Sequence, residues 1–191
     1  MRIIAGEYRG RKLFALDDLS IRPTTDRAKQ TIFDILTNRV IFEGTEVLDL
    51  FSGTGSLGLE AISRGATSVT FIEKSPRSIF VLNKNIEALK CEQRCTVHQA
   101  DVFWYLKNAH RSFDLVFADP PYKLETIGTL PNAIYDSGAV RNGTYVVMEH
   151  SRDSAVALNE TNYEILKKPF GQTTVLIMKA LVLPTAEGSR S

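Results

Sequence analysis

The sequence contains few of the groups that bind metals or cross-link a chain. Its two cysteines, Cys91 and Cys95, stand four residues apart with no second pair, and its three histidines, His98, His110 and His150, are dispersed. This spacing predicts neither a zinc site nor a disulfide framework. We therefore expect reduced thiols, a cytoplasmic protein and no bound metal.

Long apolar runs and an excess of charge of one sign are also missing. No apolar run approaches the roughly 20 residues that span a bilayer, and the charged N-terminus lacks the apolar core of a signal peptide. We expect neither a membrane span nor export. The net charge of +1 gives no overall attraction to a polyanion. A chain of 191 residues that is 43% apolar and 24% charged suits one globular domain of ordinary size.

The basic residues are nevertheless unevenly distributed. Near the N-terminus the chain carries Arg2, Arg9, Arg11, Lys12, Arg22, Arg27 and Lys29, against Glu7, Asp17, Asp18 and Asp26. Such a local excess predicts a basic surface that could contact nucleic acid. The alternative is an ordinary solvated face.

Short β-branched runs alternate with helical stretches, and this pattern predicts a doubly wound α/β fold with a mostly parallel sheet. The expected strands are residues 46–51, 68–73, 95–100, 113–119 and 143–150. The expected helices are residues 56–65, 75–90, 101–109 and part of 125–137, broken near Pro131. Residues 162–181 predict an antiparallel hairpin that turns at residues 169–171.

Two further elements are expected before the main sheet. Residues 2–16 resemble a small β-hairpin with Gly10 near its turn. Residues 24–40 form an amphipathic pattern, whose apolar face is Ala28, Ile32, Phe33, Ile35 and Leu36. We expect one domain with an N-terminal extension over 1–40, a Rossmann-like core over 41–183 and a tail over 184–191.

A glycine-rich loop, "DLFSGTGSLG", follows the first strand. Gly53 to Gly58 match the pattern G-x-G-x-x-G, and Glu73 lies twenty residues after Gly53, at the end of the next strand. This spacing predicts a nucleotide site in which the acid binds the ribose hydroxyls. By itself the pattern does not distinguish a dinucleotide from another nucleotide cofactor, and a purely structural turn is the alternative.

Two acids favour S-adenosylmethionine over a nicotinamide dinucleotide. Asp49 lies inside the first strand, where it would be close to a pyrophosphate but suits a ligand with an ammonium and a sulfonium group. Asp101 follows the third strand and could accept a hydrogen bond from an adenine amino group, with Val102 lining the ring. Because a buried acid needs a partner, loop amides are the alternative for Asp49.

The fourth strand ends at "FADPPYK", residues 117–123. Its prolines fix the backbone, so Asp119 and Tyr122 stand on a stiff loop. Alone, this could be a surface turn. In a doubly wound sheet, however, the fourth strand lies beside the first, next to the glycine loop. There Asp119 and a main-chain carbonyl could each accept an N–H of an exocyclic amine and aim its lone pair at a methyl group, while Tyr122 stacks on the base.

These motifs carry a family resemblance. The chain resembles the RsmD family of bacterial 16S rRNA guanine-N2 methyltransferases, which have a class I, Rossmann-like fold. The matching stretches are "MRIIAGEYRGRKL", "RPTTDRAKQTIFDIL", "VLDLFSGTGSLGLEAISRGA", "FIEKSPRSIFVLNKNI", "DPPY" and "GQTTVLIMK". The resemblance implies S-adenosyl-L-methionine as cofactor. It implies as substrate a guanosine of 16S rRNA, in the small ribosomal subunit or its assembly intermediate.

With the residue arguments above, the resemblance gives a complete expected site in a monomeric protein. The catalytic residues are Asp119, Pro120 and Tyr122. The cofactor-binding residues are Asp49, Ser52, Gly53, Gly55, Glu73, Lys74, Asp101, Val102 and Asp119. The RNA-binding residues are Arg2, Arg9, Arg11, Lys12, Arg22 and Arg27. The segment "RPTTDR" is expected near the site, although Thr24 or Thr25 could simply cap a helix.

Three other functions fit parts of the sequence. Asp119 would serve an adenine N6 amine equally well, but 191 residues leave no evident region for recognising a DNA sequence. An NAD-dependent oxidoreductase would leave Asp49 and the Asp-Pro-Pro-Tyr motif unexplained. An RNA-binding module without catalysis would leave the same motif without a use.

Overall fold

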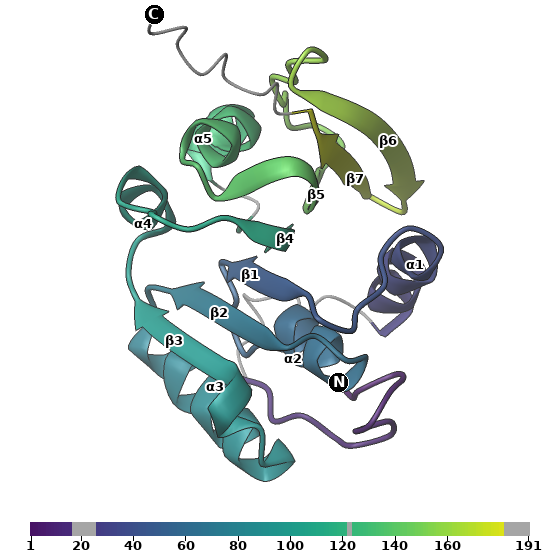
Figure 1. Ribbon diagram of the computed structural model, residues 1–191, viewed down its shortest axis with the longest axis vertical. Helices are drawn as coiled ribbons and strands as arrows, with labels where there is room; N and C mark the ends of the chain where they lie inside the picture. Colours follow the sequence, from purple (N-terminus) through teal and green to yellow (C-terminus); the bar gives the residue numbers. More distant parts are fainter. Residues whose placement is uncertain (17–25, 122–123, 182–191) are drawn as a thin grey trace, which may run out of the picture.

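The computed structural model describes residues 1–16, 26–121 and 124–181 (Figure 1). In this part of the chain seven strands form one sheet in the order β3-β2-β1-β4-β5-β7-β6. The strands are β1 (Glu46–Leu50), β2 (Ser68–Glu73), β3 (Cys95–Gln99), β4 (Phe113–Ala118), β5 (Val140–Ser151), β6 (Tyr163–Phe170) and β7 (Thr173–Ala180).

Strands β1 to β5 are parallel, and β7 is antiparallel to both β5 and β6. The end of the sheet at which β1 to β5 finish is called here the carboxyl end, and the other the amino end. Because β7 runs the opposite way, β6 finishes at the carboxyl end, where Phe170 pairs with Thr173 and Thr173 pairs with Ser151.

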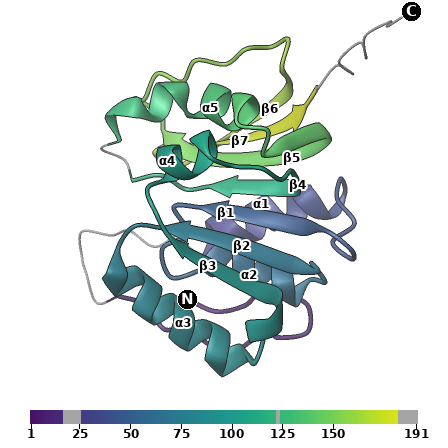
Figure 2. The same ribbon diagram turned by 60° about the vertical axis from the view of Figure 1, so that its left-hand side comes forward.

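Helices cover both faces of the sheet. They are α1 (Asp26–Thr37), α2 (Ser56–Ser63), α3 (Pro76–Leu89), α4 (Val102–Lys107) and α5 (Leu130–Asp136), with 3₁₀ turns η1 (Glu92–Arg94) and η2 (Glu125–Thr129). Helices α4 and α5 lie on one side and α1 and α2 on the other (Figures 1 and 2). Each side has its own apolar core: Phe33, Phe71 and Phe117 belong to the first, and Val116 and Met148 to the second. The expected doubly wound fold is confirmed.

Most expected elements occur within two residues of their expected bounds. Strand β5 is longer than expected, spanning 140–151 instead of 143–150, because Gly143 adopts a φ of +87° and the chain bulges between its two pairings with β4. Pro131 lies in the first turn of α5, where a missing N–H costs no helical hydrogen bond. The C-terminal hairpin is confirmed.

The N-terminal β-hairpin is only partly correct. Within the described residues a single antiparallel bridge joins Arg2 to Lys12, and the intervening chain is a series of turns. Gly6, with a φ of +82°, lies so close to α2 that a Cβ there would stand 1.7 Å from the carbonyl oxygen of Ser63. The segment is held both by its own backbone hydrogen bonds, such as that from the Ile3 amide to the Arg11 carbonyl at 2.9 Å, and by α2, whose Ser63 carbonyl accepts from the Glu7 amide at 2.7 Å.

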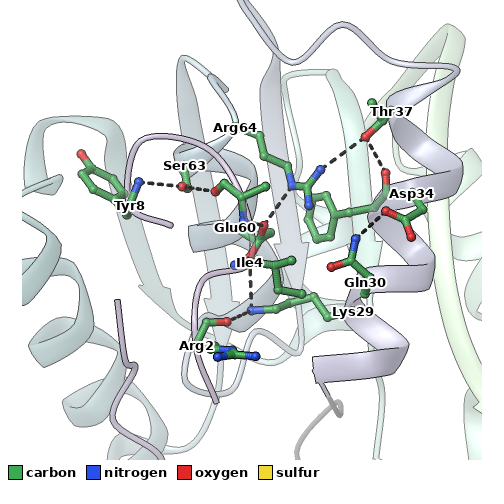
Figure 3. A network of polar contacts seen from close by, with 12 residues as sticks. Arg2, Ile4, Tyr8, Lys29, Gln30, Asp34, Thr37, Glu60, Ser63 and Arg64 are labelled. Atoms are coloured by element: carbon green, nitrogen blue, oxygen red, sulfur yellow. Dashed lines mark hydrogen bonds and ion pairs between the residues drawn. The ribbon is translucent and has the colours of Figure 1, made fainter. Parts of the chain in front are cut away.

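Helix α1 buries most of its expected apolar face, with Ile35 only half-buried, but it also buries Lys29, which the charge pattern had placed on a basic surface. The Lys29 ammonium lies 3.3 Å from a carboxylate oxygen of Glu60, on α2, and both side chains are completely buried. Glu60 also accepts hydrogen bonds from the Ile4 and Ala5 amides and from Arg64 (Figure 3). This network fastens the N-terminal segment to α1 and α2.

Two further features follow from the described residues. No helix among them has the length and apolar character needed to cross a membrane. Within the same ranges, no three or more His, Cys, Asp or Glu side chains come together as a possible metal site.

Candidate active site

Asp49 is buried beneath the start of helix α2. Its side chain is 2% exposed, and its Oδ2 accepts a hydrogen bond of 2.9 Å from the amide of Gly58. That amide belongs to the first turn of a helix, where N–H groups lack intrahelical partners. Asp49 therefore has the main-chain amide partner that was considered as the alternative to a ligand, although this amide belongs to helix α2 and not to the loop. Burial, together with Asp119 and Glu73, raises the pKa of Asp49 to about 8.

The glycine loop is shaped by its contacts with helix α3. Gly53 and Gly55 have φ angles of +54° and +86°, which favour glycine. A Cβ on Gly55 would lie 2.3 Å from Leu82 Cδ1, so the loop approaches α3 too closely for a side chain. Phe51, just before the loop, also has a positive φ, of +55°. Such strain in a residue other than glycine is typical of functional sites.

Glu73 holds the glycine loop in place from the end of β2. Its two carboxylate oxygens accept hydrogen bonds from the Gly53 amide, at 2.9 Å, and the Ser75 amide, at 2.7 Å. A carboxylate has about four acceptor positions. Glu73 can therefore hold these amides and still accept two ribose hydroxyls, as its expected role requires.

The side chain of Asp101 caps helix α4. Its Oδ1 accepts from the amides of Phe103 and Trp104, at 2.9 and 3.2 Å. These two hydrogen bonds fix the carboxylate at the carboxyl end of β3. Asp101 is exposed there, and Val102 beside it is buried. The structure thus adds a capping role that the sequence analysis did not assign.

Two buried hydroxyls beside the loop have no partner. The Oγ atoms of Ser52 and Ser56 are inaccessible to solvent and make no hydrogen bond to the described residues. Buried hydroxyls are costly in this state, so each is a candidate to bind a polar ligand group. Ser52 was expected at the site, and Ser56 was missed. Lys74, by contrast, is exposed.

The Asp-Pro-Pro segment continues β4 at the carboxyl end. Asp119 is half-buried, Pro120 is buried, and the carbonyl of Pro121 accepts from the amide of Leu124 at 2.9 Å. Since Leu50 pairs with Ala118, Asp119 begins the loop beside the one that follows β1. Its charge contributes to the raised pKa of Asp49, which places the two carboxylates in one electrostatic environment. Tyr122 lies outside the described residues.

Asn85 of helix α3 joins the glycine loop to the N-terminal segment. Its completely buried amide accepts from the Phe14 amide at 2.7 Å and donates to the carbonyls of Phe14 and Thr54, at 3.1 and 2.9 Å. The sequence analysis missed this residue. The available signal was a polar side chain on the apolar face formed by Leu82, Ile86 and Leu89.

The described residues among those expected to bind RNA come from the N-terminal segment and the start of α1. Arg9 belongs to the turn next to Ser63, which ends α2 at the amino end of the sheet, whereas Arg2 and Lys12 face one another across the bridge. Arg11, one residue before Lys12, is exposed, and Arg2 forms an ion pair of 3.6 Å with Asp26. Arg27 begins α1 near the end of β6. Arg22 and the rest of "RPTT" lie outside the described residues.

These features define a class of protein. A sheet of order 3-2-1-4-5-7-6 with β7 antiparallel is the Rossmann-like fold of class I methyltransferases. The glycine loop after β1 and the acids at the ends of β1, β2 and β4 occupy the end of the sheet at which such folds bind their ligands.

The particular family follows from sequence comparison. A family model described as "Conserved hypothetical protein 95" matches residues 1–179, and the chain belongs to this family, the RsmD family. The chain is 36% identical to "Ribosomal RNA small subunit methyltransferase D" of Haemophilus influenzae over 172 residues, which cover 88% of this chain and 87% of that protein.

Solved structures agree with this assignment. The yhhF protein of Escherichia coli has a TM-score of 0.82 and 30% identity, covering 94% of this chain and 97% of that one. A more distant structure, SMU.776 in complex with SAH (S-adenosylhomocysteine), has a TM-score of 0.65 and 18% identity over 80% of this chain and 49% of that one. That second likeness concerns the fold alone.

Proposed function

We propose that this protein is an S-adenosylmethionine-dependent methyltransferase that modifies the N2 amine of a guanosine in small-subunit rRNA. The observation that carries the proposal is the cluster of Asp49, Glu73 and Asp119 at the glycine loop, in a chain of the RsmD family. A methyltransferase of this kind acts where ribosomes are assembled, in the cytoplasm. We also propose that it acts as a monomer.

The residues around the loop fit this cofactor. Burial, with the nearby carboxylates of Asp119 and Glu73, raises the pKa of Asp49, so a ligand that carries positive charge would stabilise the ionised form of this residue. A pyrophosphate would add negative charge to the same environment. The hydroxyls of Ser52 and Ser56 make no hydrogen bond to a described residue and suit the polar amino-acid portion of the cofactor. Glu73 would hold the ribose, and Asp101 with Val102 the adenine.

The cofactor supplies an electrophilic methyl group, and the protein must present a weakly nucleophilic amine to it. The lone pair of an exocyclic amine is delocalised into the base. The carboxylate of Asp119 and the carbonyl of Pro120 would each accept one N–H, which orients the nitrogen and stabilises the positive charge that develops there. The buried ring of Pro120 fixes both acceptors. Tyr122 would stack on the base.

The test is transfer of labelled methyl groups to small ribosomal particles, naked small-subunit rRNA and DNA, followed by nucleoside analysis. We expect N2-methylguanosine in rRNA. N6-methyladenosine as the product would show that the acceptor is adenine and not guanine. Label found only in DNA would contradict the proposed rRNA substrate.

The Asp119→Ala variant tests the role of the motif. It should lower turnover at least ~100-fold, the usual effect of losing one group that stabilises a transition state, while cofactor affinity changes little. Asp119→Asn keeps one acceptor but loses the charge, so it should retain part of the activity. Turnover at the wild-type rate in Asp119→Ala would mean that the motif is only a turn.

A further inference from the structure

Three arginines at the amino end of the sheet are paired with acids. Arg111 lies 2.6 Å from Glu46, and Arg94 lies 3.3 Å from Glu7. Arg141 likewise forms an ion pair with Asp114. Other cations at this end, Arg39, Lys90 and Lys107 among them, are exposed and form no ion pair with a described residue.

At the carboxyl end, exposed cations come together from several segments of the chain. Around the end of β6 stand four exposed basic residues, and no described residue forms an ion pair with any of them: Arg27, Arg152, Lys167 and Lys168. Of the nearby acids, Asp26 pairs with Arg2, Asp153 is exposed, and Glu149 is buried on β5, two strands from Lys168. The balance of charge on this part of the surface is positive.

The fold gathers these residues from three segments. Arg152 follows β5, and its amide donates to the carbonyl of Gln172, in the turn after β6, at 3.0 Å. The guanidinium of Arg27, at the start of α1, lies 5.9 Å from the centre of the half-buried Phe170 ring. Figure 1 shows α1 beside the end of β6. Arg27, Arg152, Lys167, Lys168 and Phe170 are called here the hairpin cluster.

We propose that the hairpin cluster is an rRNA-binding surface that contacts phosphates beside the catalytic loop. The inference rests on the proposed function. Asp119 follows β4 at the same end of the sheet, so RNA held by the cluster reaches the site without crossing the molecule. Cations without acidic partners are the groups that can neutralise phosphates. Phe170, with Arg27 over its ring, also offers a stacking face.

Lys167 and Lys168 also have a structural explanation, because they lie on β6, at the edge of the sheet. Lysines on an edge strand such as β6 prevent pairing with another sheet. That role does not account for Arg27 or Arg152, which lie outside β6 and also form no ion pair with a described residue. The experiment must therefore separate local phosphate contacts from general surface charge.

The test uses the full chain with Arg152, Lys167 and Lys168 changed to Gln. A matched control changes Arg39, Lys90 and Lys107 to Gln, which removes the same charge from exposed positions at the amino end. Binding to small-subunit rRNA is measured across a salt series. Each lost phosphate contact reduces the salt slope by about 0.7–0.9, so the hairpin variant should lose about two to three and bind about tenfold more weakly or worse. The control should retain the wild-type slope.

Cofactor affinity and melting temperature should be unchanged in both variants, which shows that each is folded. Equal losses in both variants would mean that only overall charge matters, and a wild-type slope in the hairpin variant would exclude the contacts. Either result would overturn the proposed RNA-binding surface. The proposed function would still stand in that case, provided that the wild-type protein methylates rRNA. If the wild-type protein methylates no rRNA, the proposed function fails and the surface fails with it.

Discussion

Lys29 and Glu60 form an ion pair of 3.3 Å in which neither side chain is exposed to solvent. The Lys29 ammonium also donates to the carbonyl of Arg2 at 2.6 Å. Burial lowers the pKa of Lys29, and the carboxylate of Glu60 opposes that shift. These additional partners compensate for the burial of the two charges. Because Glu60 has more partners than Lys29, removing one residue should not have the same effect on stability as removing the other.

Removing Glu60 should destabilise the protein more than removing Lys29. Glu60→Ala leaves Lys29, Arg64 and two amides without their acceptor, and breaking such a buried pair costs about 3–5 kcal/mol. Lys29→Met leaves Glu60 with its other three donors, so its cost should be smaller. Chemical denaturation measures both, and Asp34→Ala on the exposed face of α1 should stay within about 0.5 kcal/mol. A larger loss for Lys29→Met would contradict this.

Asp49 should make stability depend on pH. Its pKa is 3.8 ordinarily and about 8 in the folded protein, so between these values the folded protein retains a proton that the unfolded chain has released. The free energy of unfolding should therefore decrease as pH rises from 4 to about 8, with this contribution lost above that range. The Asp49→Asn variant lacks this titration. As pH rises, wild type should therefore lose stability relative to the variant. A difference in the free energy of unfolding that does not change with pH would refute the raised pKa of Asp49.

Cofactor binding should change the protonation of Asp49. A positively charged ligand favours the carboxylate form of Asp49, so binding at pH 7 should release a proton. Calorimetry of S-adenosylmethionine binding in buffers of different ionisation enthalpy measures the release. Asp49→Asn should bind with less release, and equal values for the two proteins would place the proton elsewhere.

Glu73→Ala should weaken cofactor binding by about ten- to a hundredfold, because hydrogen bonds to a charged group contribute about 1.5–3 kcal/mol. The variant also frees the Gly53 and Ser75 amides, so its glycine loop loses two anchors. Glu73→Gln keeps one amide acceptor and should lose less. Tight calorimetric binding of NAD, with none of S-adenosylmethionine, would overturn the cofactor assignment.

Asn85→Ala should weaken cofactor binding as well as stability, because Thr54 in the glycine loop loses a buried donor. Ser63→Ala is the matched control: Ser63 holds the same N-terminal segment, through Tyr8 and Ala5, but far from the loop. Both variants should melt earlier, and only Asn85→Ala should bind S-adenosylhomocysteine more weakly. Equal affinities would make Asn85 a purely structural residue.

The elements that the sequence specified well are those decided by neighbours along the chain. Strand β2 has the expected bounds, 68–73, and helix α3 has the expected Ser75 cap, which accepts from the Ser78 amide at 3.3 Å. Alternating β-branched residues and a serine before a proline act within a few residues, so they are visible in the sequence.

The features that the sequence did not reveal depend on residues far apart. Lys29 reads as a surface cation until Glu60, thirty-one positions later, is placed beside it. The hydrogen bonds of Asn85 join three segments, and the Arg27–Phe170 contact spans most of the chain. A charge count near the N-terminus could not distinguish a buried lysine from an exposed one.

The position of β7 between β5 and β6 has a consequence for synthesis. Strand β6 leaves the ribosome before β7, yet β7 is its neighbour in the sheet. Until β7 is made, β6 has both edges unpaired and cannot join the sheet, because β7 is the strand that connects it to β5. The contact between Arg27 and Phe170 then brings the first helix to one of the last strands. A partly synthesised chain can have its glycine loop and Asp119 in place, but it cannot yet present the finished surface around them.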